Sequence, residues 1–306
     1  MNADSQVIVG AGLAGLIAAH AWPNSEIFEA SQQPSTNHRA LLRFRTDAVA
    51  RVTGIEFRKV RVHKGIWSEG GYHGPNIRLA NLYAQKVLGD GQLRGERSIW
   101  SIEAVDRFVA PDDFYEQLVE AVGHRVRWGQ KVDWCAPNTT FISTAPLPVT
   151  AEAFSLPHSR MMDFKRSPIM VFRCELPYAD VFQTVYFPDP SVGVYRASIT
   201  GRTLIIESMW PTLSADCAQQ IGKALGISLS DLTFDRVEQK YGKIAPIDET
   251  LRKQLLFRLT HECRVYSLGR FATWRNILLD DVVDDIAAIK RLLKANNPYD
   301  TKRAMV

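Results

Sequence analysis

The residues best suited to chemistry lie at the N-terminus, in the sequence VIVGAGLAGLIAAH and the EIFE that follows it. Glycines 10, 12 and 15 come directly after the apolar run Val7–Val9, and Glu29 follows about 20 residues after the first glycine. The pattern predicts a strand, a glycine turn, a helix and a second strand that ends at Glu29. In that order the glycines permit a tight turn, close approach of the backbone to a pyrophosphate, and close packing of helix on strand. The helix N-terminus attracts phosphate and the acid accepts ribose hydroxyls, so the segment predicts a dinucleotide site.

This motif by itself does not choose between FAD and NAD. Residues 88–96, LGDGQLRGE, superficially resemble a second glycine fingerprint, but the spacing is wrong and no apolar strand precedes them. We therefore expect a loop there and no second domain for NADPH. The polar stretch 32–50 places Arg39 where a pyrophosphate would lie; it is either a phosphate or flavin contact or part of a solvated basic face.

Length and composition bound the remaining possibilities. The chain has 306 residues, 46% hydrophobic and 23% charged, which predicts a soluble globular protein of two domains or one domain with a large insertion. The net charge of +4 and pI of about 8.8 suit an anionic ligand or weak nucleic-acid contact. The four cysteines form no CxxC pair, so neither a metal site nor a redox dithiol is expected. No apolar run is long enough for a membrane span, and we expect a cytoplasmic protein.

Apolar periodicity and turn residues predict the other elements. We expect helices over 111–123, 214–226 and from 279 onward, and strands over 139–143 and 265–268. The segment 125–135 is interpreted as two strands. A run of consecutive strands is expected over 167–176, 183–188, 192–200 and 202–210.

The sequence GRFATWRNILLDDVV near the C-terminus resembles the flavin-binding motif of the UDP-galactopyranose mutase and amine-oxidase-like FAD superfamily, which is roughly G-R-x-G-T-Y-R-Y-x-D-M-D. Gly269, Arg270, Thr273, Arg275 and Asp280 match that pattern. FISTAPLP resembles the superfamily's strand that re-enters near the flavin, and GQKVDW resembles its adenine-side strand. These segments cover about a third of the chain.

The resemblance implies an α/β fold: a Rossmann-like FAD-binding domain of the glutathione-reductase type with an inserted, mainly antiparallel β substrate domain. We expect residues 1–50, 98–150 and 256–306 in the FAD-binding domain and residues 51–97 and 151–255 in the substrate domain. The cofactor implied is FAD. Its expected contacts are Gly10, Ala11, Gly12, Leu13, Ala14, Gly15, Glu29, Ala30, Arg39, Val132, Thr144, Gly269, Arg270, Asp280 and Asp281.

Substrate contacts are expected at three places. The resemblance puts Trp274 and Asn276 beside the flavin, Tyr72 and His73 lie in a glycine-rich stretch that could cover the site, and Arg196 suits a substrate carboxylate or phosphate. For each of these five, the alternative is packing or solvent exposure. The mutase pattern has a tyrosine where this chain has Asn276 and an aspartate where it has Leu278, which argues against mutase activity.

These observations predict an FAD-dependent oxidoreductase that oxidises the C–N bond of an amine or amino-acid derivative by hydride transfer to flavin N5. One version is a flavin-dependent lyase acting on an amino-acid-modified nucleotide in phage DNA, whose substrate is nucleotide-linked and whose partner is DNA. Two alternatives stay open: a mutase-like flavoenzyme without net redox chemistry, and a non-catalytic flavin-binding module.

Overall fold

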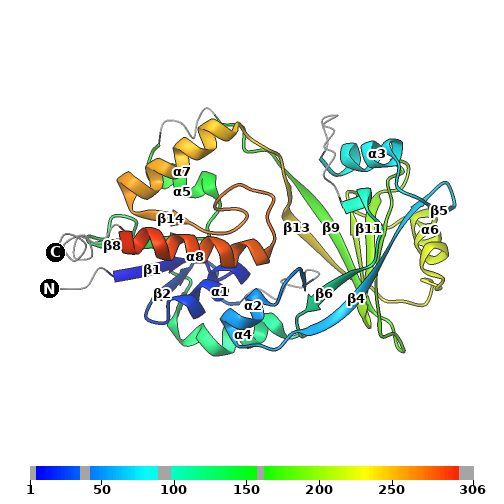
Figure 1. The fold of residues 1–306 in the computed structure, drawn as a ribbon, viewed down its shortest axis with the longest axis horizontal. Coiled ribbons are helices and arrows are strands. Elements are labelled where there is room, and N and C mark those ends of the chain that lie inside the picture. Colours follow the sequence, from blue (N-terminus) through cyan, green and yellow to red (C-terminus); the bar gives the residue numbers. More distant parts are fainter. Residues whose placement is uncertain (1–4, 35–41, 89–97, 157–161, 296–306) are drawn as a thin grey trace. The chain divides into compact units, whose positions relative to one another are not determined.

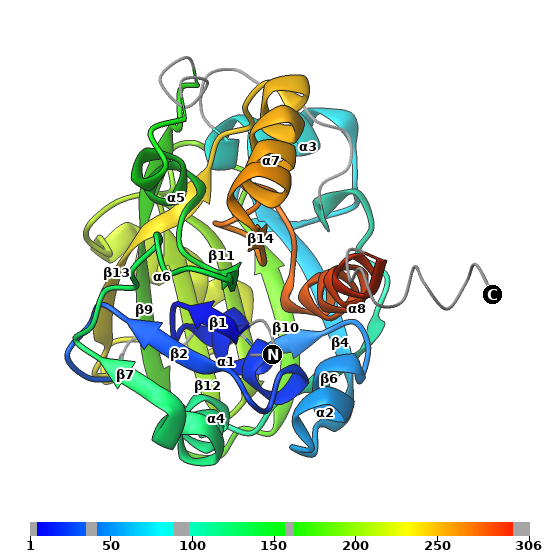
Figure 2. The same cartoon turned by 90° about the vertical axis from the view of Figure 1, so that its left-hand side faces the viewer.

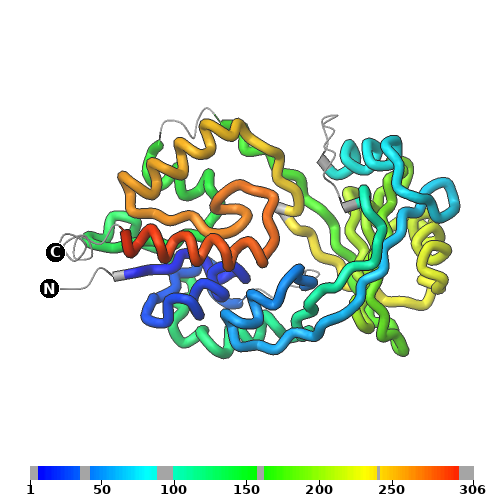
Figure 3. Tube along the Cα trace, viewed as in Figure 1, coloured from blue at the N-terminus to red at the C-terminus, as the bar shows by residue number. Residues whose placement is uncertain are grey.

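The structure is a computed structural model that describes residues 5–34, 42–88, 98–156 and 162–295. The chain divides into two compact units. The first contains Met1–Arg58, Phe108–Phe164 and Pro246–Val306, and the second contains Lys59–Arg107 and Lys165–Ala245. Figure 3 traces this path: the chain leaves the first unit twice and returns to it twice.

The first unit is built on a five-stranded sheet in the order β14-β8-β1-β2-β7, and every neighbouring pair is parallel. Figures 1 and 2 show α5 and α7 on the opposite side of this sheet from α1, α2 and α4. The elements of this unit are β1 (Ser5–Val9), α1 (Leu13–Ala21), β2 (Glu26–Glu29), β3 (Arg43–Phe44), α2 (Ala48–Thr53), α4 (Phe114–Val122), β7 (Val126–Trp128), β8 (Thr139–Ser143), α5 (Leu147–Ala153), α7 (Glu249–Cys263), β14 (Val265–Ser267) and α8 (Leu279–Ala295).

One core joins the sheet to α1, α2, α4 and α8. Ile8, Ile27 and Ile142 contribute from three central strands, and Leu16 and Ile286 from two of the helices. β8 is buried along its whole length because both of its faces are covered, as is usual in parallel sheets. The core therefore fixes the carboxyl ends of β1, β2 and β8, where ligands bind in folds of this kind.

The second unit is built on a mainly antiparallel sheet in the order β13-β9-β12-β11-β10-β4-β6, with β5 paired to β4. The last two residues of β6, Phe108 and Val109, belong to the first unit and pair there with β3. Among the strand pairs of this unit whose residue register the structure describes, β4–β10 is parallel and the others are antiparallel. Its elements are β4 (Arg58–Ser68), β5 (Gly71–His73), α3 (Ile77–Leu88), β6 (Val105–Val109), β9 (Arg166–Glu175), β10 (Val181–Tyr186), β11 (Val194–Gly201), β12 (Thr203–Ser208), α6 (Ala215–Leu225) and β13 (Asp235–Ile244). The predicted α/β class, with a parallel sheet and a second, mainly antiparallel one, is confirmed.

Two local predictions were wrong. The second strand expected within 125–135 does not form, because Gly129 takes φ +71° and its N–H bonds to Ser31 O instead of continuing the ladder. The chain around Val132 is irregular. The stretch containing Tyr72 and His73 is strand β5 rather than a covering loop, since both residues pair with β4.

Lys86 on α3 ties that helix to the β10–β11 connection. Its ammonium donates hydrogen bonds to Phe187 O at 2.8 Å, Asp189 O at 2.7 Å and Val194 O at 2.6 Å. Burial lowers the pKa of this ammonium to about 7. The Lys86 ammonium thus binds three backbone carbonyls, but burying its charge costs desolvation free energy.

We expect this buried lysine to make stability depend on pH. Between about pH 7 and the ordinary pKa of 10.5, the unfolded chain binds more protons at Lys86 than the folded chain does, so the free energy of unfolding rises with pH. From pH 7 to pH 9, the free energy of unfolding should rise by about 2 kcal/mol more for the wild type than for Lys86→Met, as measured by urea denaturation. Lys223→Met, at an exposed site on α6, is the control and should give a parallel curve. A Lys86→Met curve parallel to the wild type would contradict the prediction.

Candidate cofactor site

The turn between β1 and α1 leaves no room for side chains. Gly10 has φ +98° and donates its N–H to Phe28 O at 2.8 Å. A Cβ at Gly10 would lie 2.4 Å from Thr144 Oγ1, and a Cβ at Gly15 would lie 1.9 Å from Gly10 O. The backbone is therefore bare where α1 begins, and Gly12 at the N-cap brings no side-chain hydrogen bond to the first turn. Bare N–H groups at a helix N-terminus are what a phosphate needs.

Thr144, at the end of β8, closes the turn from the other side. Its N–H and its hydroxyl both donate to Val9 O, each at 2.8 Å. The side chain thereby fixes the end of β1 against the end of β8. Thr144 was predicted as a cofactor contact, and the structure brings it to the glycine turn.

Glu29, at the end of β2, lies beside the same turn. Its Oε2 accepts a hydrogen bond from Ala11 N at 2.7 Å and its Oε1 accepts one from Ser31 N at 2.8 Å. These two bonds fix the carboxylate, and each oxygen keeps a lone pair for a further donor. A ribose diol is a donor of the right kind, because ribose hydroxyls are the usual partners of an acid at this place.

The C-terminal turn comes back to the first turn of α1. Gly269 has φ +87°, and a Cβ on it would lie 3.1 Å from Ala14 Cβ and 3.8 Å from Val282 Cγ2. Thr273 closes this turn by donating its N–H and its hydroxyl to Gly269 O, at 3.0 and 2.7 Å. The two glycine segments, far apart in the sequence, therefore meet at one place in the first unit.

Arg252 on α7 supports the C-terminal turn from behind. The side chain is buried, donates to Thr273 O at 2.9 Å, and forms an ion pair with Glu249. Sequence reasoning missed it, because an arginine within a charged helix looks like a solvated residue. The only available signal was an apolar neighbourhood on one side of that helix.

The two residues expected beside the flavin differ in exposure. Trp274 is 3% exposed, takes φ +49° and packs edge-on against Phe164 with 5.0 Å between ring centroids. A tryptophan with positive φ is strained, and the surrounding hydrogen bonds must hold it there. Asn276 is exposed. The substrate contacts expected at both positions remain predictions.

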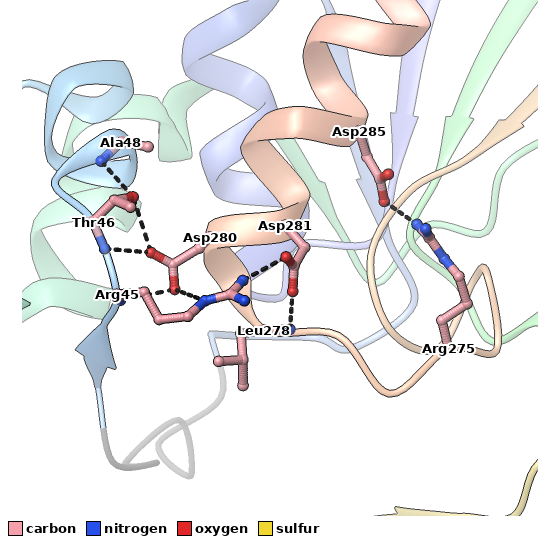
Figure 4. Close-up of polar contacts among 8 residues, drawn as sticks. All are labelled: Arg45, Thr46, Ala48, Arg275, Leu278, Asp280, Asp281 and Asp285. Carbon is pink, nitrogen blue, oxygen red and sulfur yellow. Dashed lines mark hydrogen bonds and ion pairs between the residues drawn. The ribbon is translucent and has the colours of Figure 1, made fainter. Parts of the chain in front are cut away.

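Two acidic side chains at the start of α8 point toward the β3–α2 connection (Figure 4). Asp280 is 5% exposed and accepts hydrogen bonds from Arg45 N at 3.1 Å, Thr46 N at 3.0 Å and Thr46 Oγ1 at 3.1 Å. Asp281 accepts a hydrogen bond from Leu278 N at 2.8 Å and forms an ion pair with Arg45. Both acids were predicted as cofactor contacts, and the structure joins them to the β3–α2 connection.

Arg196, expected to bind a substrate anion, lies in the second unit beside a bulge of β11. The bulge between Val194 and Arg196 puts Tyr195 and Arg196 on one face, where both contact Glu207 of β12. Burial opposes ionisation of Glu207, but the Arg196 guanidinium overcomes it and keeps the pKa of Glu207 below its ordinary value. The Arg196 side chain stays 30% exposed.

Leu13 is the first residue of α1, and Arg270 directly follows Gly269 in the C-terminal turn. The remaining predicted residues fall into three groups. Tyr72 donates to Ala224 O and packs edge-on against Trp67, and His73 Nε2 lies 2.8 Å from Ser68 O, so both have partners within the second unit. Ala30 is exposed directly after Glu29. Arg39 and most of the loop expected over 88–96 lie outside the described residues.

The described residues contain neither a metal-binding cluster nor a membrane-spanning helix. Within the described ranges, no three or more histidine, cysteine, aspartate or glutamate side chains are grouped closely enough to hold a metal ion. None of the helices that the structure describes has the length and apolar character needed to cross a bilayer.

Comparison with known proteins gives a result for the fold alone. No protein-family model matches the chain, and no curated protein matches it. Among solved structures, reduced UDP-galactopyranose mutase is similar with a TM-score of 0.66 and 16% identity, covering 96% of this chain and 94% of that one. A putative protoporphyrinogen oxidase from Exiguobacterium sp. 255-15 has a TM-score of 0.57 and 11% identity, covering 96% and 99%. A putrescine oxidase variant has a TM-score of 0.53 and 12% identity, covering 93% and 98%. The chain therefore shares its overall fold with these three enzymes.

Proposed function

We propose that this protein is an FAD-dependent oxidoreductase that oxidises a C–N bond in an amine or amino-acid derivative. The observation that carries the proposal is the bare turn at Gly10 and Gly15, which any side chain would fill, next to the fixed carboxylate of Glu29. These groups suit a pyrophosphate and a ribose in that order. The shared fold with a protoporphyrinogen oxidase and a putrescine oxidase supports oxidase chemistry of the same general kind.

The chain's own residues would bind and orient the cofactor. The first turn of α1 would hold the pyrophosphate, Glu29 would accept hydrogen bonds from the adenosine ribose hydroxyls, and Gly269 would leave the backbone open to the ribityl chain. Bound FAD would supply a hydride acceptor for the C–H bond next to the substrate nitrogen, with oxygen or another external compound as the final electron acceptor. The substrate would lose that hydride and a proton from nitrogen, and water would hydrolyse the resulting C=N bond to a carbonyl compound and a free amine.

The proposal is tested first by the absorbance spectrum of the purified protein, with and without added FAD. Anaerobic bleaching of the bound flavin by amines, amino acids and amino-acid-modified thymidine, free and in duplex DNA, then identifies the substrate class. Bleaching by modified DNA alone would support the phage DNA lyase and a DNA partner. A colourless protein that takes up no FAD would overturn the cofactor, and a flavin that no compound of the panel reduces would favour the non-catalytic module.

A mutase-like reaction without net redox change is the second candidate. The fold likeness to UDP-galactopyranose mutase, with a TM-score of 0.66, favours it. Asn276 and Leu278 stand against it, because the mutase pattern has a tyrosine and an aspartate there. This candidate predicts turnover of UDP-galactopyranose only after dithionite reduction, and no bleaching by any amine.

A further inference from the structure

The N-terminus of α8 attracts negative charge, but two acidic side chains in its first turn counteract that attraction. A helix N-terminus favours nearby negative charge, whereas Asp280 and Asp281 in the first turn of α8 cancel that effect. The turns at Gly10 and at Gly269 together form what we call the glycine cradle. The first turn of α8 borders it, because a Cβ on Gly269 would lie 3.1 Å from Ala14 Cβ of α1 and 3.8 Å from Val282 Cγ2 of α8. Two carboxylates there would repel the pyrophosphate of FAD and the negative charge that a flavin gains on reduction.

Arg45 is the cation that faces both acids. Its guanidinium forms an ion pair with Asp281, and its Nε lies 3.7 Å from Asp280 Oδ2 (Figure 4). The backbone N–H of the same residue donates to Asp280 at 3.1 Å. One side chain thus offsets one of the two negative charges and turns both carboxylates toward the β3–α2 connection.

We propose that Arg45 is a positioning residue for the cofactor, which sets the charge at the start of α8 and thereby the affinity for FAD and the reduction potential of the flavin. The inference rests on the proposed function, since it assumes FAD in the glycine cradle. It extends that function, because Arg45 lies outside both glycine motifs.

The geometry makes the side-chain charge separable from the local fold. In Arg45→Met, Asp280 keeps the hydrogen bonds from the N–H groups of residues 45 and 46 and from Thr46 Oγ1. What is lost is one positive charge beside two carboxylates. The pair is partly exposed, with the Arg45 side chain 45% and the Asp281 side chain 31% accessible, so the cost in folding stability is small.

The experiment measures the FAD dissociation constant and the two-electron midpoint potential of the holoprotein. For Arg45→Met we expect the dissociation constant to rise about tenfold and the potential to fall by about 30 mV, a tenfold change in the redox equilibrium. Asp281→Asn removes one negative charge and should shift the potential upward, and the double variant should return toward the wild type. Arg51→Met is the matched control, because it removes the same charge from an exposed pair with Asp47 on nearby α2; its potential should equal that of the wild type.

Each outcome decides the matter. If the wild type takes up no FAD, the proposed function fails and this inference fails with it. If the wild type binds FAD and Arg45→Met leaves the potential unchanged, only this inference is overturned, even where the melting temperature falls. If Arg45→Met does not fold or retains no flavin, Asp281→Asn decides: an upward shift supports the role of the charge, and an unchanged potential overturns it.

Discussion

Gly15→Ala should reduce the affinity for FAD at least a hundredfold. A Cβ at this position would lie 1.9 Å from Gly10 O, a separation that no non-bonded carbon and oxygen atoms tolerate. The backbone of the turn must therefore move, and the N–H groups at the start of α1 move with it. A phosphate site made of backbone groups depends on their positions, so binding is lost even where the unit still folds. Fluorescence titration of the apoprotein with FAD measures the loss.

Gly123→Ala is the matched control for that substitution. Gly123 also has helical backbone angles in the first unit, but a Cβ on it would meet only Val119 Cγ1, at 3.4 Å. This variant should bind FAD as the wild type does. Circular dichroism of both variants separates a lost site from a lost fold. Wild-type FAD affinity in a folded Gly15→Ala protein would show that the glycine turn does not hold the cofactor.

Glu207→Ala should lower the free energy of unfolding by about 2–3 kcal/mol, because it leaves the partly enclosed Arg196 guanidinium without its partner. The Tyr195 hydroxyl, 3.0 Å from Glu207 Oε1, loses its acceptor as well. The effect depends on pH with a defined sign. Since the folded pKa of Glu207 lies below the ordinary 4.5, the stabilisation is complete above that value and is lost as the pH falls through the folded pKa.

Two further variants test this reading by urea denaturation. Glu69→Ala breaks the exposed Arg78–Glu69 pair in the same unit and should cost less than about 1 kcal/mol. The double variant Arg196→Met/Glu207→Leu replaces the buried pair by apolar groups and should recover most of the lost stability. If Glu207→Ala and Glu69→Ala cost the same, the pair on β11 and β12 is not a buried ion pair in solution.

Elements with a strong local pattern are predictable from the sequence. The first strand, turn and helix are predicted from the run Val7–Val9, the three glycines and Glu29. The glycines mark the turn because no residue with a Cβ fits there. The helix from Leu279 onward was predicted for a similar reason, since apolar residues repeat along it at helical spacing. The segment before this helix, residues 269–278, resembles a flavin-binding motif, and that resemblance is the source of the FAD hypothesis.

Where the local pattern was weak, the prediction was wrong or absent. The stretch at Tyr72 looked like a loop because it is rich in glycine, yet pairing with β4 makes it a strand, and the Tyr72 ring needs Gly65 beneath it, where a Cβ would lie 2.5 Å away. The strand expected at Val132 fails because Gly129 leaves the ladder. Pairing between distant segments overrides local propensity in both cases.

Which charged side chains meet depends on how distant segments pack in the folded chain. Arg45 and Asp281 are 236 residues apart, and Arg252 is 21 residues from the carbonyl of Thr273 that it holds. The spacing of these residues in the sequence does not identify them as partners. A charged side chain is expected to be solvated unless a distant segment covers it in the fold. The glycine motifs fix the backbone of the candidate cofactor site through sterics, which are local. Its electrostatics come from side chains that the fold brings together, since Coulomb interactions depend on distance in space and not along the chain.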